Sequence, residues 1–264
     1  MRVEDDLALL SNAARESARI ALSYFGQSPD VFWKEGNSPV SQADLAVDGY
    51  LRDHLLSARP HYGWVSEETA SEPGRGPDAP FFVVDPIDGT RSFLRGEATW
   101  CVALAVIDDG RPVAGIIDAP VAGEIFSATS TGDALLNGRP CCVSSPDPDR
   151  RLRLSLPDRL RRSADAQRLE GFDLAPSIPS LAYRLALVAC GRLDGTIVLP
   201  RANDWDIAAA DLILQRAGGT LMTTHRTRHL YKLNPRRHGL LIAGADHALD
   251  RLFELADTLD AGAA

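Results

Sequence analysis

The stretch Phe81-Phe82-Val83-Val84-Asp85-Pro86-Ile87-Asp88-Gly89-Thr90 decides how the rest of this sequence is interpreted. Its apolar beginning predicts a buried strand, which we expect to stop at Pro86 because proline cannot donate to a sheet. Asp85 and Asp88 supply two carboxylates, Gly89 allows close backbone approach to a ligand, and Thr90 offers an N–H and a hydroxyl at a helix start. These residues also favour a simple turn. After a buried strand, the whole stretch instead predicts a site for a divalent metal and a phosphate together.

Composition narrows the class of protein. The chain of 264 residues is 45% hydrophobic and 24% charged, which is typical of a globular protein. Its net charge of −8 argues against a nucleic acid polymer as a partner. Four cysteines without a CxxC pair fit a reduced, cytoplasmic protein, and no apolar run reaches the length of a membrane span. Because the protein is acidic, bound cations would have to supply positive charge for phosphate esters.

The residues before the central stretch predict two helices and two further acidic candidates. Apolar spacings of three and four predict a helix over 4–25, and Ser41 is a natural N-cap for a second helix with Asp44 in its first turn. Asp44 there could simply cap the helix. Glu67 and Glu68 follow a short apolar run, although adjacent glutamates are usually a solvated surface feature. The polar segment 70–80 could form a mobile flap beside the site.

The residues after the central stretch predict a series of strands, followed by a C-terminal half of the chain that contains both helices and strands. Asp109-Gly110 joins strands over 100–107 and 112–118, a strong hairpin signal, and 124–128 forms another strand. A Ser, Pro, Asp and Arg-rich segment over 144–151 divides an N-terminal half, 1–145, from a C-terminal half, 146–264, within one catalytic unit. The second half contains helices that begin at Ser180 and near Asn203, strands over 151–156, 194–199, 219–223 and 239–243, and a helix over 246–259. The fold class is α+β.

Four of the five candidate carboxylates lie at an element end or a helix start, where a fold can bring them together. The five are Asp44, Glu67, Asp85, Asp88 and Asp206. Asp206 lies in the first turn of an alanine-rich helix, where it could serve only the helix dipole. Gathered carboxylates repel one another unless cations neutralise them. An all-oxygen donor set favours Mg²⁺ or Mn²⁺ over zinc, and two such ions about 4 Å apart can clamp the attacking and leaving oxygens of an in-line displacement.

Several segments resemble the signatures of the inositol monophosphatase superfamily, in the same order along the chain. They are Ser38-Pro39-Val40-Ser41-Gln42-Ala43-Asp44, Ser66-Glu67-Glu68, Asp85-Pro86-Ile87-Asp88-Gly89-Thr90, and Trp205-Asp206 with its helix to Gly219. Members are magnesium-dependent, lithium-sensitive phosphatases of small phosphate monoesters. The resemblance implies a layered αβαβα sandwich, a small phosphorylated metabolite as substrate, and a homodimer.

The resemblance also implies roles for individual residues. Metal one would be held by Glu67, Asp85 and the Ile87 carbonyl, metal two by Asp85, Asp88 and Asp206, and a weaker third ion by Glu67. Thr90, paired with Asp44, would help to deprotonate the attacking water. Substrate would lie against Asp88, Gly89, Thr90, Arg91 and Asp206.

The substrate branch rests on fewer residues. Ser66, Arg91 and the hairpin around Asp109-Gly110 resemble the 3′(2′),5′-bisphosphate nucleotidases, and Arg91 could contact a second phosphate. Arg91 could equally be a solvent-facing arginine. Inositol 1-phosphate, histidinol phosphate and fructose 1,6-bisphosphate are the alternatives. A dehalogenase-type phosphatase would need aspartates two residues apart, whereas Asp85 and Asp88 are three apart. A non-enzymatic regulatory role would fit a degenerate metal site, but every matched ligand is present.

Overall fold

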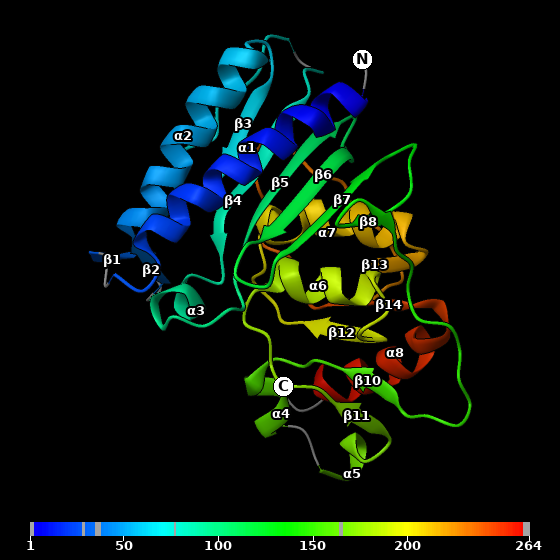
Figure 1. Ribbon diagram of the computed structural model, residues 1–264. Helices are drawn as coiled ribbons and strands as arrows, with labels where there is room; N and C mark the ends of the chain where they lie inside the picture. The colour runs from blue at the N-terminus through cyan, green and yellow to red at the C-terminus, as the bar shows by residue number, and fades with distance from the viewer. Residues whose placement is uncertain (1–2, 28–29, 35–37, 77, 164–165, 261–264) are drawn as a thin grey trace.

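The fold is a stack of five layers, alternating helices and sheets. The computed structural model describes residues 3–27, 30–34, 38–76, 78–163 and 166–260. Helices α1 (Val3–Tyr24) and α2 (Gln42–Ala58) form the first layer, and α6 (Leu181–Ala189) and α7 (Asp204–Arg216) lie between the two sheets (Figure 1). Helix α8 (Asp246–Asp260) covers the outer face of the second sheet. The expected αβαβα sandwich of the α+β class is therefore confirmed.

The first sheet has seven strands in sequence order: β3 (Gly63–Ser66), β4 (Phe81–Asp88), β5 (Cys101–Asp108), β6 (Arg111–Ala119), β7 (Glu124–Thr129), β8 (Leu135–Leu136) and β9 (Arg139–Pro140). Only β3 and β4 are parallel; the other neighbouring pairs are antiparallel. The predicted Asp109-Gly110 turn is present, with φ of 47° and 70°, as a two-residue hairpin of the type I′ kind requires.

The second sheet has five strands in the order β11 (Phe172–Leu174), β10 (Leu152–Leu154), β12 (Gly195–Val198), β14 (Leu241–Ala245) and β13 (Gly219–Thr223). Strands β10, β11 and β12 run parallel, whereas β14 is antiparallel to β12 and β13. The smaller elements are β1 (Val31–Lys34), β2 (Ser38–Ser41), α3 (Thr90–Leu94), α4 (Asp158–Ser163) and α5 (Ala166–Leu169).

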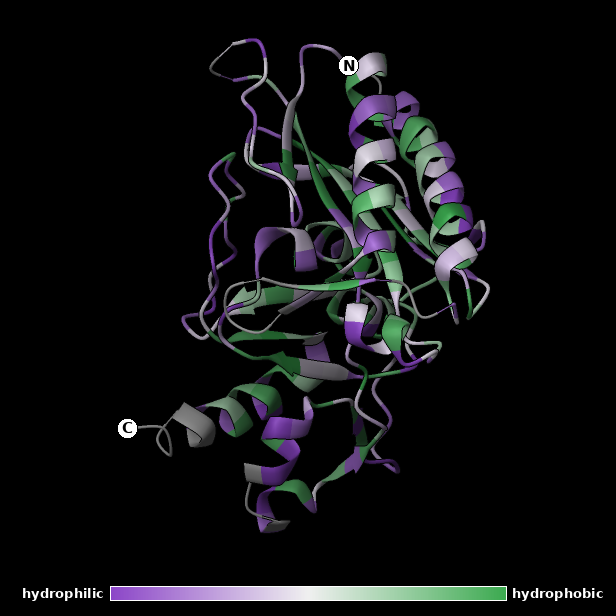
Figure 2. Ribbon diagram, turned by 90° about the vertical axis from the view of Figure 1, so that its left-hand side faces the viewer, coloured by the Kyte–Doolittle hydropathy of each residue, from purple (hydrophilic) through white to green (hydrophobic). Residues whose placement is uncertain are grey.

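Alternating side chains divide the core into layers. On β5, Val102, Leu104 and Val106 pack under α1 and α2, while the intervening residues face α6 and α7. On β14, Ile242 faces α8 while Leu241 and Ala243 face α6 and α7. Figure 2 shows the matching alternation of hydrophobic and hydrophilic residues along the N-terminal helices. Because α7 packs on both sheets, its first turn is held between them.

One strand boundary was predicted wrongly. Strand β4 does not stop at Pro86 but continues to Asp88, with a register shift against β5 between Asp85 and Asp88. A proline is tolerated inside a strand at such an irregularity, because the residues there make no regular ladder bond. Asp85 and Asp88 therefore both lie in the last part of β4. The division at residue 145 stays a prediction; the strands of the first sheet all precede it.

Candidate active site

Three of the predicted carboxylates meet at the edge where β3 and β4 end. These two strands are parallel, with Ser66 opposite Val84, so Glu67, the first residue after β3, lies beside Asp85 of β4. The first turn of α7 brings Asp206 to the same place. One ligand oxygen from each of Glu67, Asp85 and Asp206 lies within 4.8 Å of the others, the only such group of acidic, histidine or cysteine side chains among the described residues.

The electrostatics of this group favour a bound cation. Burial raises the pKa of Asp85 well above its ordinary value, and the charges of Glu67, Asp88 and Asp206 raise it further. Burial and the charge of Asp88 likewise raise the pKa of Asp206. Oxygen-only donors fit a hard divalent cation, which would remove this repulsion. The residues present therefore fit the divalent cation that the sequence predicted, Mg²⁺ or Mn²⁺.

Asp88 lies beside this group and is held by the start of α6. Its Oδ2 accepts hydrogen bonds from the Ser180 hydroxyl and from the Ala182 N–H, both at 2.6 Å. Burial raises the pKa of Asp88 to about 6, although the bonds from Ser180, Ala182 and Leu181 oppose that rise. The sequence predicted a helix that begins at Ser180, and Ser180 is the N-cap of α6. The sequence gave no sign that the Ser180 hydroxyl also binds Asp88, which lies 92 residues earlier in the chain.

Asp44 serves as a helix cap and also reaches the site. Its Oδ2 accepts from the Ser41 N–H at 2.7 Å, while its own N–H donates to the Ser41 Oγ at 3.4 Å, and these two bonds form the capping box of α2. The Ser41 hydroxyl also donates to the same Oδ2, at 2.5 Å. Its Oδ1 accepts from the Thr90 hydroxyl at 3.3 Å. The same hydroxyl lies 3.1 Å from the Ile87 carbonyl oxygen. Capping and a place in the site are therefore compatible for Asp44, rather than alternatives.

Gly89 occupies a position that only glycine fits. Its φ is +93°, and a Cβ there would lie 2.9 Å from the Thr99 carbonyl oxygen and 3.1 Å from Ser180 Cβ. It precedes α3, a helix of only five residues, which ends at Leu94. Arg91 is exposed on this short helix. The predicted role of Gly89, Thr90 and Arg91 in binding phosphate stays a prediction.

The predicted flap is bound to the first sheet along part of its length. Glu72 exchanges two backbone hydrogen bonds with Trp64, at 2.8 and 2.9 Å, and its carboxylate pairs with Arg52 at 2.7 Å. These bonds hold the first part of segment 70–80 against β3. Movement of this segment during a reaction stays a prediction.

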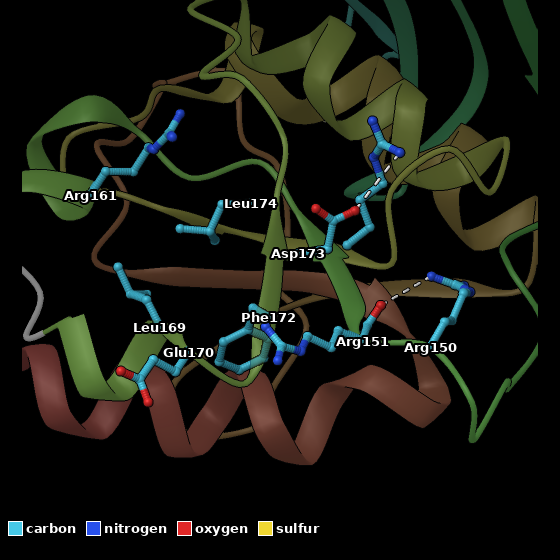
Figure 3. A pocket seen from close by; sticks show the side chains of 9 residues that line it. Arg150, Arg151, Arg161, Leu169, Glu170, Phe172, Asp173 and Leu174 are labelled. Carbon is cyan, nitrogen blue, oxygen red and sulfur yellow. Dashed lines mark hydrogen bonds and ion pairs between the residues drawn. The ribbon is translucent and has the colours of Figure 1, made fainter.

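A further pocket lies away from these residues, at the outer edge of the second sheet. It measures about 840 Å³ and is lined by four arginines, of which Figure 3 labels Arg150, Arg151 and Arg161. Arg150 pairs with buried Asp194 at 2.6 Å, and Arg153 pairs with Asp173 at 3.8 Å. The pocket contains neither a member of the carboxylate group nor a residue of the central stretch, so we do not assign the chemistry to it.

The fold and the site together define a class: an α+β sandwich with an acidic centre whose oxygen donors suit a divalent cation. The sequence model of the family described as "Inositol monophosphatase family" matches residues 3–259 of this chain. "Inositol monophosphatase 3" of Solanum lycopersicum is 30% identical over 230 residues, which cover 82% of this chain and 85% of that protein. The chain belongs to the inositol monophosphatase family.

Two further comparisons agree with this assignment. "Histidinol-phosphatase" of Chlorobaculum parvum is 31% identical over 230 residues, covering 81% of this chain and 84% of that protein. The structure of the extragenic suppressor protein suhB from Bartonella henselae has a TM-score of 0.83 at 27% identity, and covers 95% of this chain and 98% of that chain. Family membership implies phosphatase activity. No helix in the described part of the chain is long and apolar enough to span a bilayer.

Proposed function

We propose that the protein is a Mg²⁺-dependent, Li⁺-sensitive phosphatase that hydrolyses a small phosphate monoester by direct attack of water. The observation that carries this proposal is the meeting of Glu67, Asp85 and Asp206 in a member of a phosphatase family. Divalent cations bound there would neutralise the phosphate and stabilise the charge that develops during phosphoryl transfer. Glu67, Asp85, Asp206, the Ile87 carbonyl and Asp88 are the groups that would hold them.

We assign the remaining steps to Thr90, Asp44 and Asp88, and their hydrogen bonds support this assignment. Thr90 donates its hydroxyl hydrogen bond to Asp44, so the hydroxyl can take a proton from the attacking water while Asp44 accepts one from the hydroxyl. Water adds to phosphorus and the ester P–O bond breaks. The leaving oxygen takes up a proton from solvent, so the products are phosphate and an alcohol. Ser180 and Ala182 fix the orientation of the Asp88 carboxylate throughout.

Among substrates we favour 3′-phosphoadenosine 5′-phosphate, on the strength of Ser66 and Arg91, with inositol 1-phosphate as the alternative. Histidinol phosphate and fructose 1,6-bisphosphate are also worth testing, since one relative is named a histidinol-phosphatase. We further propose a cytoplasmic homodimer, which light scattering would test.

Phosphate release from these four compounds tests the proposal. Each is incubated with protein and Mg²⁺, with EDTA, or with Mg²⁺ and added Li⁺. We expect release that requires Mg²⁺ and falls with Li⁺, and the highest kcat/KM identifies the substrate branch. A folded protein that releases phosphate from none of them would contradict the proposal and favour a regulatory role.

A further inference from the structure

A second pocket opens directly beside the candidate active site. It measures about 450 Å³ and is lined by residues of α3, α6 and the loop 198–202, among others. Arg91, which lines it, follows Thr90 in the chain. Leu181, also in its wall, lies between Ser180 and Ala182, the two residues that hold Asp88. A substrate whose phosphate reached the carboxylates would therefore extend its other end toward this pocket.

The walls of this pocket are rich in positive charge. The pocket is lined by four arginines and by one acidic residue, Asp158. The arginines are Arg91, Arg95, Arg184 and Arg201. Arg95 already pairs with Glu97 at 2.7 Å. In a chain with a net charge of −8, this concentration of guanidinium groups next to an acidic centre is not a bulk property of the protein. It indicates local recognition of negative charge.

Arg184 is the decisive member of this group. Only 5% of the residue is exposed, and Nη1 donates to the Ile178 carbonyl at 2.8 Å. Its Nε is buried and has no hydrogen-bond partner among the described residues, nor does any described carboxylate form an ion pair with the guanidinium. Burial lowers the pKa of Arg184 to about 10, although the charge of Asp88 opposes that fall, so the guanidinium stays charged at neutral pH. Its Nε hydrogen still lacks an acceptor, and a buried donor left without one is costly.

Arg201, which also lines the pocket, has a second unusual feature. Its φ is +87°, a left-handed conformation that costs energy for a residue with a side chain. Its N–H bonds to the His238 carbonyl at 2.8 Å, which fixes the loop in that shape. Arg201 is exposed, so it can turn toward a ligand without being freed from a buried partner.

Building on the phosphatase function proposed above, we propose that this pocket binds a second anionic group of the substrate, with Arg184 as its principal ligand. The substrate class is then a phosphate monoester that carries another phosphate or carboxylate, rather than a monoester of a neutral alcohol. The second anion supplies the missing partner of the Arg184 Nε. A planar guanidinium suits either group, since both accept paired hydrogen bonds.

Matched substrate pairs separate this inference from the phosphatase function itself. The pairs are 3′-phosphoadenosine 5′-phosphate with adenosine 3′-phosphate, fructose 1,6-bisphosphate with fructose 1-phosphate, and 2-phosphoglycerate with glycerol 2-phosphate. In at least one pair we expect kcat/KM to be about 10- to 100-fold higher for the member with the second anion, as expected for a buried charge-assisted hydrogen bond. Equal values within all three pairs would overturn the inference while leaving the phosphatase function intact.

Variants of Arg184 then test the assignment of the ligand. Arg184→Gln should reduce the preference to less than about threefold, mainly through KM, and Arg184→Lys should restore part of it because the charge remains. Arg153→Gln, an exposed arginine of the other pocket, serves as the control and should keep the wild-type preference. If Arg184 is only structural, Arg184→Gln will lower the melting temperature and reduce kcat/KM equally for both members of a pair, and the inference fails.

Binding provides a readout that does not depend on turnover. Calorimetry in EDTA compares the two members of each pair with wild-type protein and with Arg184→Gln. We expect tighter binding of the member with two anions, lost in the variant. If neither member of any pair is hydrolysed, this comparison still decides: a lack of preference in binding overturns the inference.

Discussion

Glu67 and Glu68 are neighbours of the same residue type, yet the structure gives them different surroundings. Only Glu67 belongs to the group with Asp85 and Asp206, and Glu68 follows one position later, where its N–H bonds to the Ser66 hydroxyl at 3.2 Å. The sequence could not separate the pair without the family resemblance. The parallel pairing of β3 and β4 separates them, because it brings Glu67 to the strand end beside Asp85.

This difference leads to a paired prediction. Glu67→Gln keeps the size of the side chain but removes the charge, so we expect kcat to fall at least about 100-fold, a loss of about 3 kcal/mol in transition-state stabilisation. Glu68→Gln should keep kcat within about threefold of wild type. Steady-state kinetics at saturating Mg²⁺ measure both, and a similar loss in the two variants would contradict the assignment.

At the scale of elements, local signals predicted most helices and hairpins. They did not predict that strand β4 continues past Pro86. Ser41 and Ser180 are the N-caps that their sequence positions indicate, because a cap depends on a few adjacent residues. The continuation of β4 past Pro86 depends on a register shift against β5, which no local pattern reveals. The same holds for Asp88, whose partners come from a helix much later in the chain.

The buried carboxylate of Asp194 connects several segments at the second sheet through hydrogen bonds. Asp194, 1% exposed, precedes β12 and accepts hydrogen bonds from Arg150, from the Arg153 N–H at 2.6 Å and from Ser144. Burial alone would raise the pKa of Asp194, but the bonds from Arg150, Ser144 and Arg153 outweigh it and lower the pKa to about 2. The carboxylate is therefore charged and fully used at neutral pH.

We expect Asp194→Ala to lower the free energy of unfolding by about 3 kcal/mol, since it leaves the Arg153 N–H and the Arg150 guanidinium without their buried acceptor. The control is Asp173→Ala, whose ion pair with Arg153 at 3.8 Å is about half exposed on both sides. That variant should lose less than about 1 kcal/mol. Urea unfolding at pH 7 measures both; equal losses would show that Asp194 has no special structural role.

At the scale of the whole molecule, the five layers followed from the family resemblance, while physical reasoning alone reached only the α+β class. Alternation along single strands predicts burial but not which helix covers which face. The gathering of Glu67, Asp85 and Asp206 needs both sheets, because α7 presents Asp206 from between them. Arg184 escaped sequence reasoning for the same reason: in the sequence it is one arginine in an apolar helix, and only its burial with an unsatisfied Nε distinguishes it.

Charges buried away from the site should also shape how stability depends on pH. Asp118, on β6, is 5% exposed, and burial raises its pKa from 3.8 to about 6, a rise that the charge of Arg15 partly opposes. Because the folded pKa lies above the unfolded one, the folded state holds this proton more tightly. The contribution of Asp118 to stability is therefore fully present below about pH 4 and is lost as the pH rises through about 6.

We accordingly expect Asp118→Asn to be more stable than wild type at pH 7.5 by up to about 3 kcal/mol, which corresponds to a shift of about two pKa units. Near pH 4 the two proteins should unfold at the same urea concentration, because wild-type Asp118 is then protonated in the folded state. Asp53→Asn, whose side chain is 86% exposed, should show no difference that changes with pH. A constant gap between Asp118→Asn and wild type across this range would instead indicate a packing effect, because only an ionising carboxylate makes the gap grow as protons leave.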